Sequence, residues 1–197
     1  MGAPTVRDAA GTLAEAYHDG ALFCHVLPDP RRRAERLPWL FEGALLHCRR
    51  HGEVEVVDGV DAVAGWVAGP RLALTPADLV RTGLIAAPAR LGATQSLRLD
   101  RHERACEGPL LDAVTEATAY LWMLGVRPER RGEGLGAHTV AVVLAAMARL
   151  GHRRCLLRTE EPDDVPLYRH LGFEVVEHLT ELPSGLPAWI MARSTSV

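Results

Sequence analysis

The chain has 197 residues, which is enough for one domain with a buried core. Hydrophobic residues make up 48% of the chain, and the formal net charge is −3. This balance gives no electrostatic case for binding nucleic acid or an anionic membrane surface. All 22 basic residues are arginine. That composition is typical of a GC-rich genome, and we expect a bacterial source.

The cysteines and the N-terminal segment predict a cytoplasmic protein. The cysteines show no paired spacing, so we expect them to be reduced thiols: Cys24, Cys48, Cys106 and Cys155. Residues 1–20 lack the basic-then-apolar layout of a signal peptide, and no apolar run is long enough to span a bilayer. We therefore expect a cytoplasmic location and no membrane partner.

The first part of the chain is expected to be mostly helical. Thr5–Arg7 is predicted to be a short extended start. Helical periodicity then runs from Ala9 to Gly52, with a break at residues 27–30, where two prolines lie. The second half of this region repeats apolar side chains every three or four residues, as one buried helix face does: Leu37, Leu40, Phe41, Leu45 and Leu46.

Strands and helices alternate in the rest of the chain. Glu53–Val57 and Val63–Val67 are predicted to form a hairpin around an Asp-Gly turn, and residues 70–112 a helical stretch interrupted by prolines. The elements predicted after it are strand, helix, strand, helix and a closing strand pair: Ala117–Val126, Gly136–Leu150, Cys155–Thr159, Val165–Leu171, Phe173–Leu182 and Ala188–Arg193. We expect residues 1–197 to form a single mixed α/β domain.

A glycine-rich turn between the strand Ala117–Val126 and the helix after it carries the clearest chemical signal. Gly132, Gly134 and Gly136 lack the Cβ atoms that would hold a ligand away from the backbone. The helix starts without Ser, Thr, Asp or Asn, so its first N–H groups have no side-chain acceptor. A pyrophosphate would supply that acceptor, and Arg130 or Arg131 would add positive charge.

Other glycine motifs fit this turn less well. A nucleotide P-loop requires Gly-Lys-Ser/Thr, which the segment lacks. A dinucleotide fingerprint requires G-x-G-x-x-G, whereas the spacing here is G-x-G-x-G. A tight strand–helix connection without a ligand is the remaining alternative.

Two blocks of sequence resemble the GNAT acetyltransferase superfamily. Arg131-x-x-Gly134-x-Gly136 is similar to the Q/R-x-x-G-x-G/A signature of these enzymes, and residues 165–176 resemble their P-x-Y-x-x-x-G-F segment. The overall layout, including Ala16-Tyr17-His18-Asp19, looks like the branch that contains puromycin N-acetyltransferase. The resemblance implies a mostly antiparallel, twisted central sheet flanked by helices, with a splayed strand pair that holds acyl-CoA.

The same resemblance implies that acetyl-CoA is the co-substrate, and we expect no metal cofactor. Backbone groups of Leu124 and Val126 would bind the pantetheine arm, and the Val126 N–H would polarise the thioester carbonyl. The remaining residues expected to bind the cofactor come from the glycine turn and from the start of the short helix: Arg131, Gly132, Glu133, Gly134, Leu135, Gly136, Ala137 and Asp164.

The resemblance also implies that Tyr168 is the general acid, since a neutral tyrosine hydroxyl can protonate a departing thiolate. The alternative is a core aromatic whose hydroxyl is bonded to backbone or solvent. The general base stays open among Glu116, Glu42, His25 and a water chain. Glu42 is otherwise a solvated helix charge, and His25 a satisfied loop imidazole.

Two positions depart from the pattern of relatives. Asp164 stands where relatives frequently have Asn; it can still accept a hydrogen bond and cap the helix Val165–Leu171, but it cannot donate one. Arg158 stands where puromycin-type relatives have Glu. We expect Arg158 either to pair with an anion on the acceptor or to bind a neighbouring Glu160 or Glu161.

The acceptor is expected to be the primary amine of a small molecule, with the helical stretch 70–112 covering the site. A protein or peptide acetyltransferase and a non-catalytic acyl-CoA sensor are the alternatives, and the acyl chain length stays open. Trp122 is expected to face either the core or the acceptor. His47-x-x-x-His51 is expected to hold no metal, since no further ligand has suitable spacing in the sequence. The apolar terminal strands suggest a homodimer.

Overall fold

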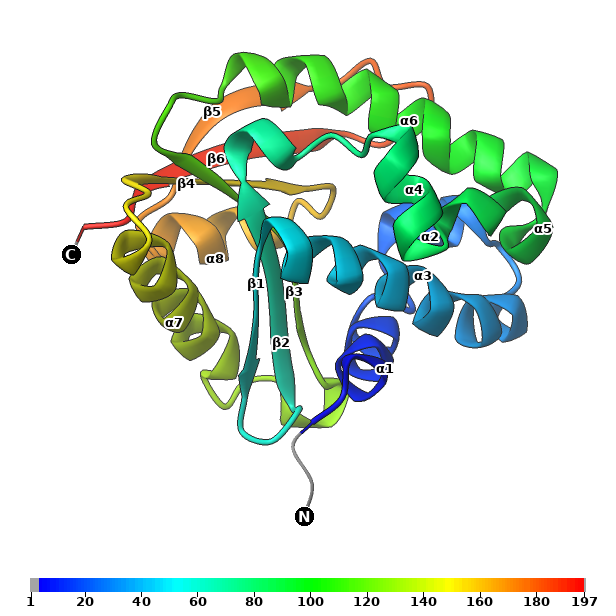
Figure 1. Ribbon diagram of the computed structural model, residues 1–197, viewed down its shortest axis with the longest axis horizontal. Helices are drawn as coiled ribbons and strands as arrows, with labels where there is room; N and C mark the ends of the chain where they lie inside the picture. The colour runs from blue at the N-terminus through cyan, green and yellow to red at the C-terminus, as the bar shows by residue number, and fades with distance from the viewer. Residues whose placement is uncertain (1–3, 197) are drawn as a thin grey trace.

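A computed structural model describes residues 4–196, in which a six-stranded sheet has helices on both faces (Figure 1). The strand order is β1-β2-β3-β4-β6-β5. All neighbouring strands are antiparallel except β3 and β4, which are parallel. The expected mixed α/β class with a mostly antiparallel sheet is confirmed. The strands are Gly52–Val57 (β1), Ala62–Ala68 (β2), Thr118–Val126 (β3), Arg154–Thr159 (β4), Glu174–Leu179 (β5) and Ala188–Ser194 (β6).

The helices divide into two groups, one on each face of the sheet. Helices α7 (Leu135–Arg149) and α8 (Asp164–His170) cover one face. The other face carries Val6–Ala16 (α1), Ala21–Val26 (α2), Pro30–His51 (α3), Pro76–Thr82 (α4), Ala87–Leu91 (α5) and Ala93–Asp112 (α6). None of the described helices has both the length and the apolar character that crossing a bilayer requires.

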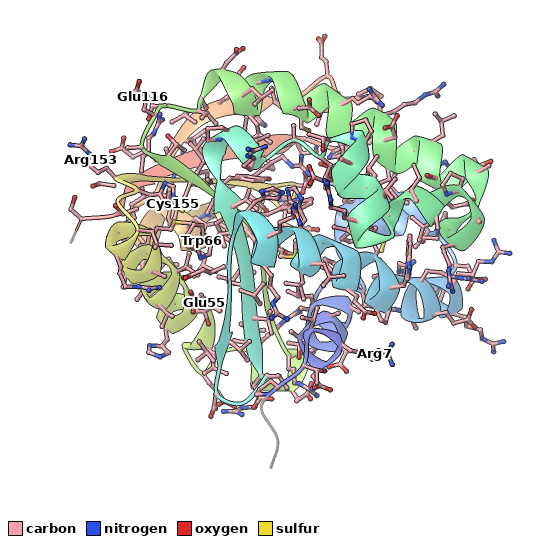
Figure 2. The ribbon with its side chains drawn as sticks, viewed as in Figure 1. Arg7, Glu55, Trp66, Glu116, Arg153 and Cys155 are labelled. Carbon is pink, nitrogen blue, oxygen red and sulfur yellow. The ribbon has the colours of Figure 1, made fainter. Side chains whose placement is uncertain are left out.

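The core lies on both faces of the sheet, because central strands bury both sets of side chains. Every residue of β2 from Ala62 to Val67 is buried. Trp66 and Cys155 pack under α7 in the interior, whereas Arg7 and Arg153 lie at the rim (Figure 2). Residues of β3 and α7, the two elements that flank the glycine turn, are part of this core.

Two predicted boundaries at the N-terminal end were wrong for identifiable reasons. Val6 and Arg7, predicted to be extended, are the first residues of α1. Thr5 accepts a hydrogen bond from the Asp8 N–H, and the Asp8 carboxylate accepts one from the Thr5 backbone N–H, which is a capping box. Gly52, predicted to end a helix, instead pairs with Val67 as the first residue of β1.

The closing strand pair is confirmed, but its two strands have different roles. β6 lies between β4 and β5 and is largely buried. β5 lies at the edge of the sheet, is mostly exposed, and ends at Leu179 instead of the predicted Leu182. The apolar sequence of β6 is therefore explained by its place inside the sheet, without a second subunit.

Candidate active site

The parallel strands β3 and β4 separate halfway along their length. Their pairing begins at Thr118 with Arg154 and ends at Leu121 with Leu157. β3 nevertheless continues to Val126 against β2, and β4 continues to Thr159 against β6. Residues 122–126 and 158–159 therefore have no described strand partner on the sides where β3 and β4 face one another, and we call the region between them the opening. The Leu124 N–H on this edge is bonded to the Tyr17 hydroxyl.

A β-bulge lies where the strands separate. Gly65 pairs with Met123 and Trp66 pairs with Leu121, so Trp122 has no partner on β2. Such an extra residue bends its strand and increases the local twist. The Trp122 side chain is half-buried and packs edge-on against His47 of α3, with ring centroids 5.5 Å apart. Trp122 therefore faces the side of the sheet covered by α1 to α6.

Two glycines of the turn have a backbone conformation that other residues rarely adopt. Gly132 and Gly134 have φ angles of +85° and +80°, in the left-handed region that favours glycine. Gly134 is the N-cap of α7 and makes no side-chain capping bond. The first backbone bond of the helix is from the His138 N–H to the Gly134 carbonyl. The N–H groups of Leu135, Gly136 and Ala137 therefore remain available to an anion at the positive end of the helix dipole.

The two arginines of the turn have different surroundings. Arg130 is paired with the carboxylates of Asp58, Asp61 and Glu133, and its hydrogen bonds to Glu133 and Asp58 raise its pKa further. Arg131 makes one described bond, 2.7 Å from Nη2 to the Ala16 carbonyl, and has no described carboxylate partner. Arg131 is thus the guanidinium available to a phosphate, and Glu133 is engaged by Arg130.

Tyr168 lies on α8 and packs edge-on against Phe173, with ring centroids 5.7 Å apart. Its hydroxyl has no described hydrogen-bond partner among residues 4–196. Burial raises the pKa of Tyr168 well above the usual value, and Tyr17 and Asp164 add to the rise. The phenol is therefore neutral across the physiological pH range, as proton donation requires.

Tyr17 is a residue of this region that the sequence interpretation did not assign a role. The Leu124 N–H donates a hydrogen bond of 3.1 Å to the Tyr17 hydroxyl, so Tyr17 reaches the free edge of β3. Its ring packs among Phe23 and Phe41, and burial raises its pKa to about 12. The one signal in the sequence was that Tyr17 belongs to the segment Ala16–Asp19, which resembles relatives. That resemblance did not indicate a chemical role for Tyr17.

Asp164 begins α8, and its carboxylate contacts Thr159, the last residue of β4. The Thr159 hydroxyl donates a 3.0 Å hydrogen bond to its carboxylate, and burial raises the pKa of Asp164. Asp164 is the first residue of α8, and Asp163 occupies the cap position without a side-chain bond. The expectation that Asp164 caps this helix was therefore wrong.

Arg158 is buried in a cluster of charges between β4 and α6. Its guanidinium binds both carboxylate oxygens of Glu103, at 3.0 and 2.7 Å, and its Nε lies 2.6 Å from Glu160. The side chain is only 6% exposed. Of the two interpretations of Arg158, these contacts match pairing with Glu160; the bond to Glu103 was not foreseen.

His102 of α6 links this cluster to the turn between β5 and β6. One ring nitrogen lies 3.1 Å from Glu160 and the other 2.9 Å from the Ser184 hydroxyl. Burial alone would lower the pKa of His102, but hydrogen bonds with Cys106 and Glu160 outweigh it and raise the pKa to about 9. The protonated ring balances the second carboxylate around Arg158.

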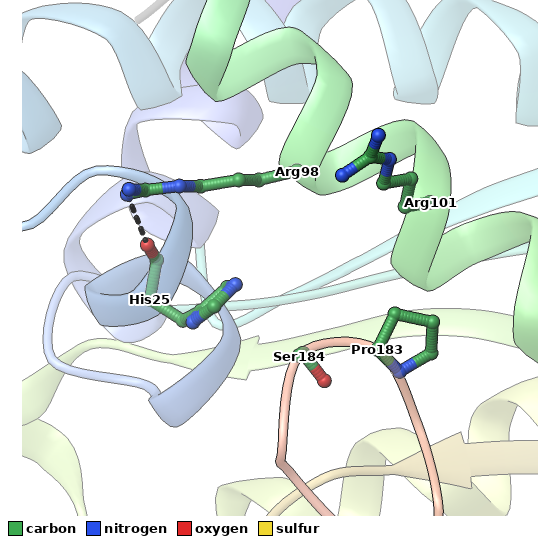
Figure 3. Close-up of a pocket in the computed structure, with 5 residues that line it drawn as sticks. All are labelled: His25, Arg98, Arg101, Pro183 and Ser184. Atoms are coloured by element: carbon green, nitrogen blue, oxygen red, sulfur yellow. Dashed lines mark hydrogen bonds between the residues drawn. The ribbon is translucent and has the colours of Figure 1, made fainter.

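A cationic pocket of about 220 Å³ adjoins this cluster (Figure 3). Arg98 and Arg101 project from α6, His25 comes from α2, and Pro183 and Ser184 complete the wall. Arg98 donates to the His25 carbonyl at 3.3 Å. Burial lowers the pKa of His25, and the nearby Arg98 adds to the effect, so its imidazole is neutral at pH 7.

The other two candidate bases lie elsewhere. Glu116 is exposed and precedes β3 at the end where β3 and β4 are paired (Figure 2). Glu116 lies in a turn before the first residue of β3, and the strand pairing continues for four residues before the strands separate. The Glu42 carboxylate lies 4.0 Å from Arg7, at the N-terminal end of α1. That end of α1 is opposite to Tyr17, so Glu42 has the contacts of a surface helix charge.

Comparison with known proteins agrees with this arrangement. Residues 86–173, which contain β3, the glycine turn, α7, β4 and α8, match the acetyltransferase (GNAT) family. A solved structure from Desulfovibrio desulfuricans, assigned to the GNAT acetyltransferase family, aligns over 98% of this chain and 94% of its own. Its TM-score is 0.55 and its sequence identity is 17%. The fold is the GNAT fold.

Other matches, to acetyltransferases, cover less of the chain. A mycothiol acetyltransferase from Geodermatophilus obscurus is 39% identical over 74 residues, which are 36% of this chain and 22% of that protein. The chain therefore spans about a fifth of this curated relative. The structure of a nourseothricin acetyltransferase aligns over 40% of this chain and 51% of its own, with 21% identity and a TM-score of 0.37.

Proposed function

We propose that the protein is an acyl-CoA-dependent N-acetyltransferase that acts on the primary amine of a small molecule. The observation that carries this proposal is the separation of β3 and β4 directly beside an uncapped, glycine-rich helix start. The opening presents backbone hydrogen-bonding groups to an extended arm. The start of α7 presents N–H groups to a pyrophosphate, and Arg131 adds the charge.

Acetyl-CoA supplies the activated acyl group when bound. The residues expected to hold it are Arg131, the backbone of residues 132–137, and the edge of β3 at Leu124 and Val126. The Leu124 N–H would exchange its bond to the Tyr17 hydroxyl for one to the pantetheine arm. The Val126 N–H is proposed to donate to the thioester oxygen, where negative charge develops. A donor placed there is worth roughly 3–4 kcal/mol of the barrier.

Tyr168 is proposed as the general acid. Its hydroxyl is free of described protein partners, and its raised pKa keeps the proton in place until a thiolate departs. Asp164, whose carboxylate is already bonded to Thr159, is proposed to hold the end of β4 in the shape that the cofactor needs.

The acceptor is proposed to enter through the pocket lined by His25, Arg98 and Arg101. His25 is the base candidate that the surroundings favour, because it is neutral at pH 7 and lines a pocket. Since Arg158 is already neutralised by two carboxylates, the guanidiniums of Arg98 and Arg101 are the groups left to bind an anion. We therefore expect an amine that also carries a carboxylate or another negative group.

A calorimetric titration with acetyl-CoA, CoA and longer acyl-CoAs tests the proposal first. A ligand at a hundred times its dissociation constant adds about 2.7 kcal/mol of stability, which a thermal shift detects. A screen of amines by thiol release then tests transfer, with matched acceptors that do or do not carry a carboxylate. Failure of every acyl-CoA to bind would overturn the assignment. If Arg98→Ala lost the same fraction of activity with both types of acceptor, only the proposal of an anionic acceptor would be overturned.

A further inference from the structure

Three side chains of types that bind metal ions meet between α3 and α4, and one of them, His47, packs against Trp122 where β3 and β4 separate. His47 and His51 are one turn apart on α3, and Asp78 comes from the first turn of α4. One ligand atom from each lies within 4.8 Å of the other two. The spacing in the sequence revealed no suitable third ligand near the two histidines, and the fold supplies it from 27 residues beyond His51.

His47 has one ring nitrogen committed and the other unused. Its Nε2 lies 2.9 Å from the Arg71 carbonyl, which can only accept, so Nε2 carries the proton. Nδ1 therefore carries a lone pair. That atom is buried and has no partner among the described residues, in a side chain that is 0% exposed. Histidines that bind metals commonly donate their other N–H to a carbonyl in this way.

Asp78 is oriented with one oxygen left for a second partner. Its Oδ2 accepts from the Thr75 backbone N–H at 3.2 Å and from the Thr75 hydroxyl at 2.6 Å. Its Oδ1 lies 3.1 Å from Nε2 of His51. Two ligand atoms on a tetrahedral ion with bonds of about 2.1 Å are about 3.4 Å apart, so this pair needs only a small adjustment.

Comparison with a second cluster of similar composition shows how the cluster at Asp78 differs from it. His102, Cys106 and Glu160 also lie within 4.8 Å of one another. There, both ring nitrogens of His102 are bonded, and the Arg158 guanidinium contacts the carboxylate at 2.6 Å. The Glu160 carboxylate is therefore already paired with a cation. The cluster at Asp78 has an unused nitrogen and no described salt bridge to an arginine.

We propose that Nδ1 of His47, Nε2 of His51 and Oδ1 of Asp78 bind a divalent metal ion of the Zn²⁺ type. Two imidazoles and one carboxylate suit borderline transition metals better than Mg²⁺ or Ca²⁺, which prefer oxygen ligands. The His51 side chain is 14% exposed and gives the ion a path from solvent. Bound there, the ion joins α3 to α4 and fixes His47 against Trp122 at the β3 bulge.

Titration of tag-free protein, stripped with a chelator, with Co²⁺ tests this site. We expect one equivalent to bind with a visible absorption band and Zn²⁺ to displace it. At a hundred times the dissociation constant, the melting temperature should rise by about 5–10 °C. His51→Gln and Asp78→Asn are the test variants, and the amide oxygen introduced by the second keeps an acceptor for Thr75. His170→Gln, at an exposed histidine on α8, is the control.

The proposal holds if both test variants lose the band and the thermal shift while the control keeps them. Absence of a Co²⁺ band in the unaltered protein overturns it and leaves the His51–Asp78 hydrogen bond as the whole of the cluster. Retention of the band in both test variants, or an equal thermal shift with Mg²⁺, overturns it as well. None of these readouts depends on acyl transfer.

Discussion

The glycine turn before α7 and the charged cluster around Arg158 present polar groups by different means. The turn exposes backbone N–H groups of consecutive residues and needs left-handed glycines at positions 132 and 134. The cluster assembles side chains from α6, β4 and the β5–β6 turn, and buries a guanidinium between two carboxylates. Loss of one side chain leaves the turn's donors in place, whereas in the cluster it leaves a buried charge unpaired.

The largest effect is expected from removal of the Tyr168 hydroxyl, which should lower turnover. This change would separate catalysis from the binding roles of the glycine turn and of the charged cluster. Tyr168→Phe removes the proposed proton donor and keeps the ring against Phe173. We expect kcat to fall about 10²- to 10⁴-fold. Stopped assays of thiol release give kcat, and calorimetry should give an unchanged dissociation constant for acetyl-CoA. Unchanged kcat would show that Tyr168 is only a core aromatic.

Breaking the charged cluster is expected to cost stability more than any change at the turn. Arg158→Ala leaves Glu103 without its cation and Glu160 with His102 alone. We expect the free energy of unfolding to fall by about 3 kcal/mol, the lower end of the range for a broken buried pair, because Glu103 is 38% exposed. The control is Arg104→Ala, which removes an exposed pair with Asp100 and should cost no more than about 1 kcal/mol. Urea unfolding measures both. Equal losses would show that the cluster is not a tightly coupled unit.

The protonation of His102 makes the same cluster sensitive to pH. The pKa of His102 is raised to about 9 in the folded protein from its ordinary value of 6.5. Its contribution to stability is therefore complete below pH 6.5 and is lost as the pH rises through 9. We expect the free energy of unfolding to fall by on the order of 1–3 kcal/mol over this range.

Urea unfolding at a series of pH values from about 6 to about 9.5 measures this loss, with the His102→Gln variant beside it. The variant should be less stable near the acidic end of the series and should show a flatter profile. A profile as steep as that of the unaltered protein would assign the pH dependence to other groups.

The smallest effect is expected from the arginines of the turn, which form a matched pair. Arg131→Ala should weaken acetyl-CoA binding about tenfold, close to 1.4 kcal/mol, because it removes a charge-assisted contact to phosphate. Arg130→Ala should leave that affinity nearly unchanged, since Arg130 already binds Asp58, Asp61 and Glu133. Calorimetry compares the two. Equal weakening by both variants would show that net charge matters and that position does not.

The features predicted correctly are those whose signal is local in the sequence. The uncapped start of α7 follows from a few consecutive residues. The hairpin of β1 and β2 follows from an Asp-Gly turn between alternating strands. The wrong start at Thr5–Arg7 also had a local signal, because Thr5 and Asp8 have the spacing of a capping box.

The side chains that the sequence could not place are joined across long separations. Glu103 lies 55 residues before its partner Arg158, and Tyr17 lies 107 residues before Leu124, from whose N–H it accepts a hydrogen bond. No periodicity or motif links such pairs, because their contact depends on how α1 and α6 pack on the sheet. Cofactor-binding positions were therefore easier to propose from the sequence than acceptor positions.

The insertion of β6 between β4 and β5 has a consequence for the order of folding. A chain made from its N-terminus can form β1, β2, β3 and α7 from neighbouring segments as they emerge. β4 obtains its second neighbour only from residues 188–194, which follow β5 in the chain. Until they have been synthesised, Thr159 has no strand partner on either side, because β3 has already separated from β4 at this point. One wall of the opening is thus among the last parts of the sheet to be completed, and a ribosome-bound chain that stops before β6 should bind no acyl-CoA.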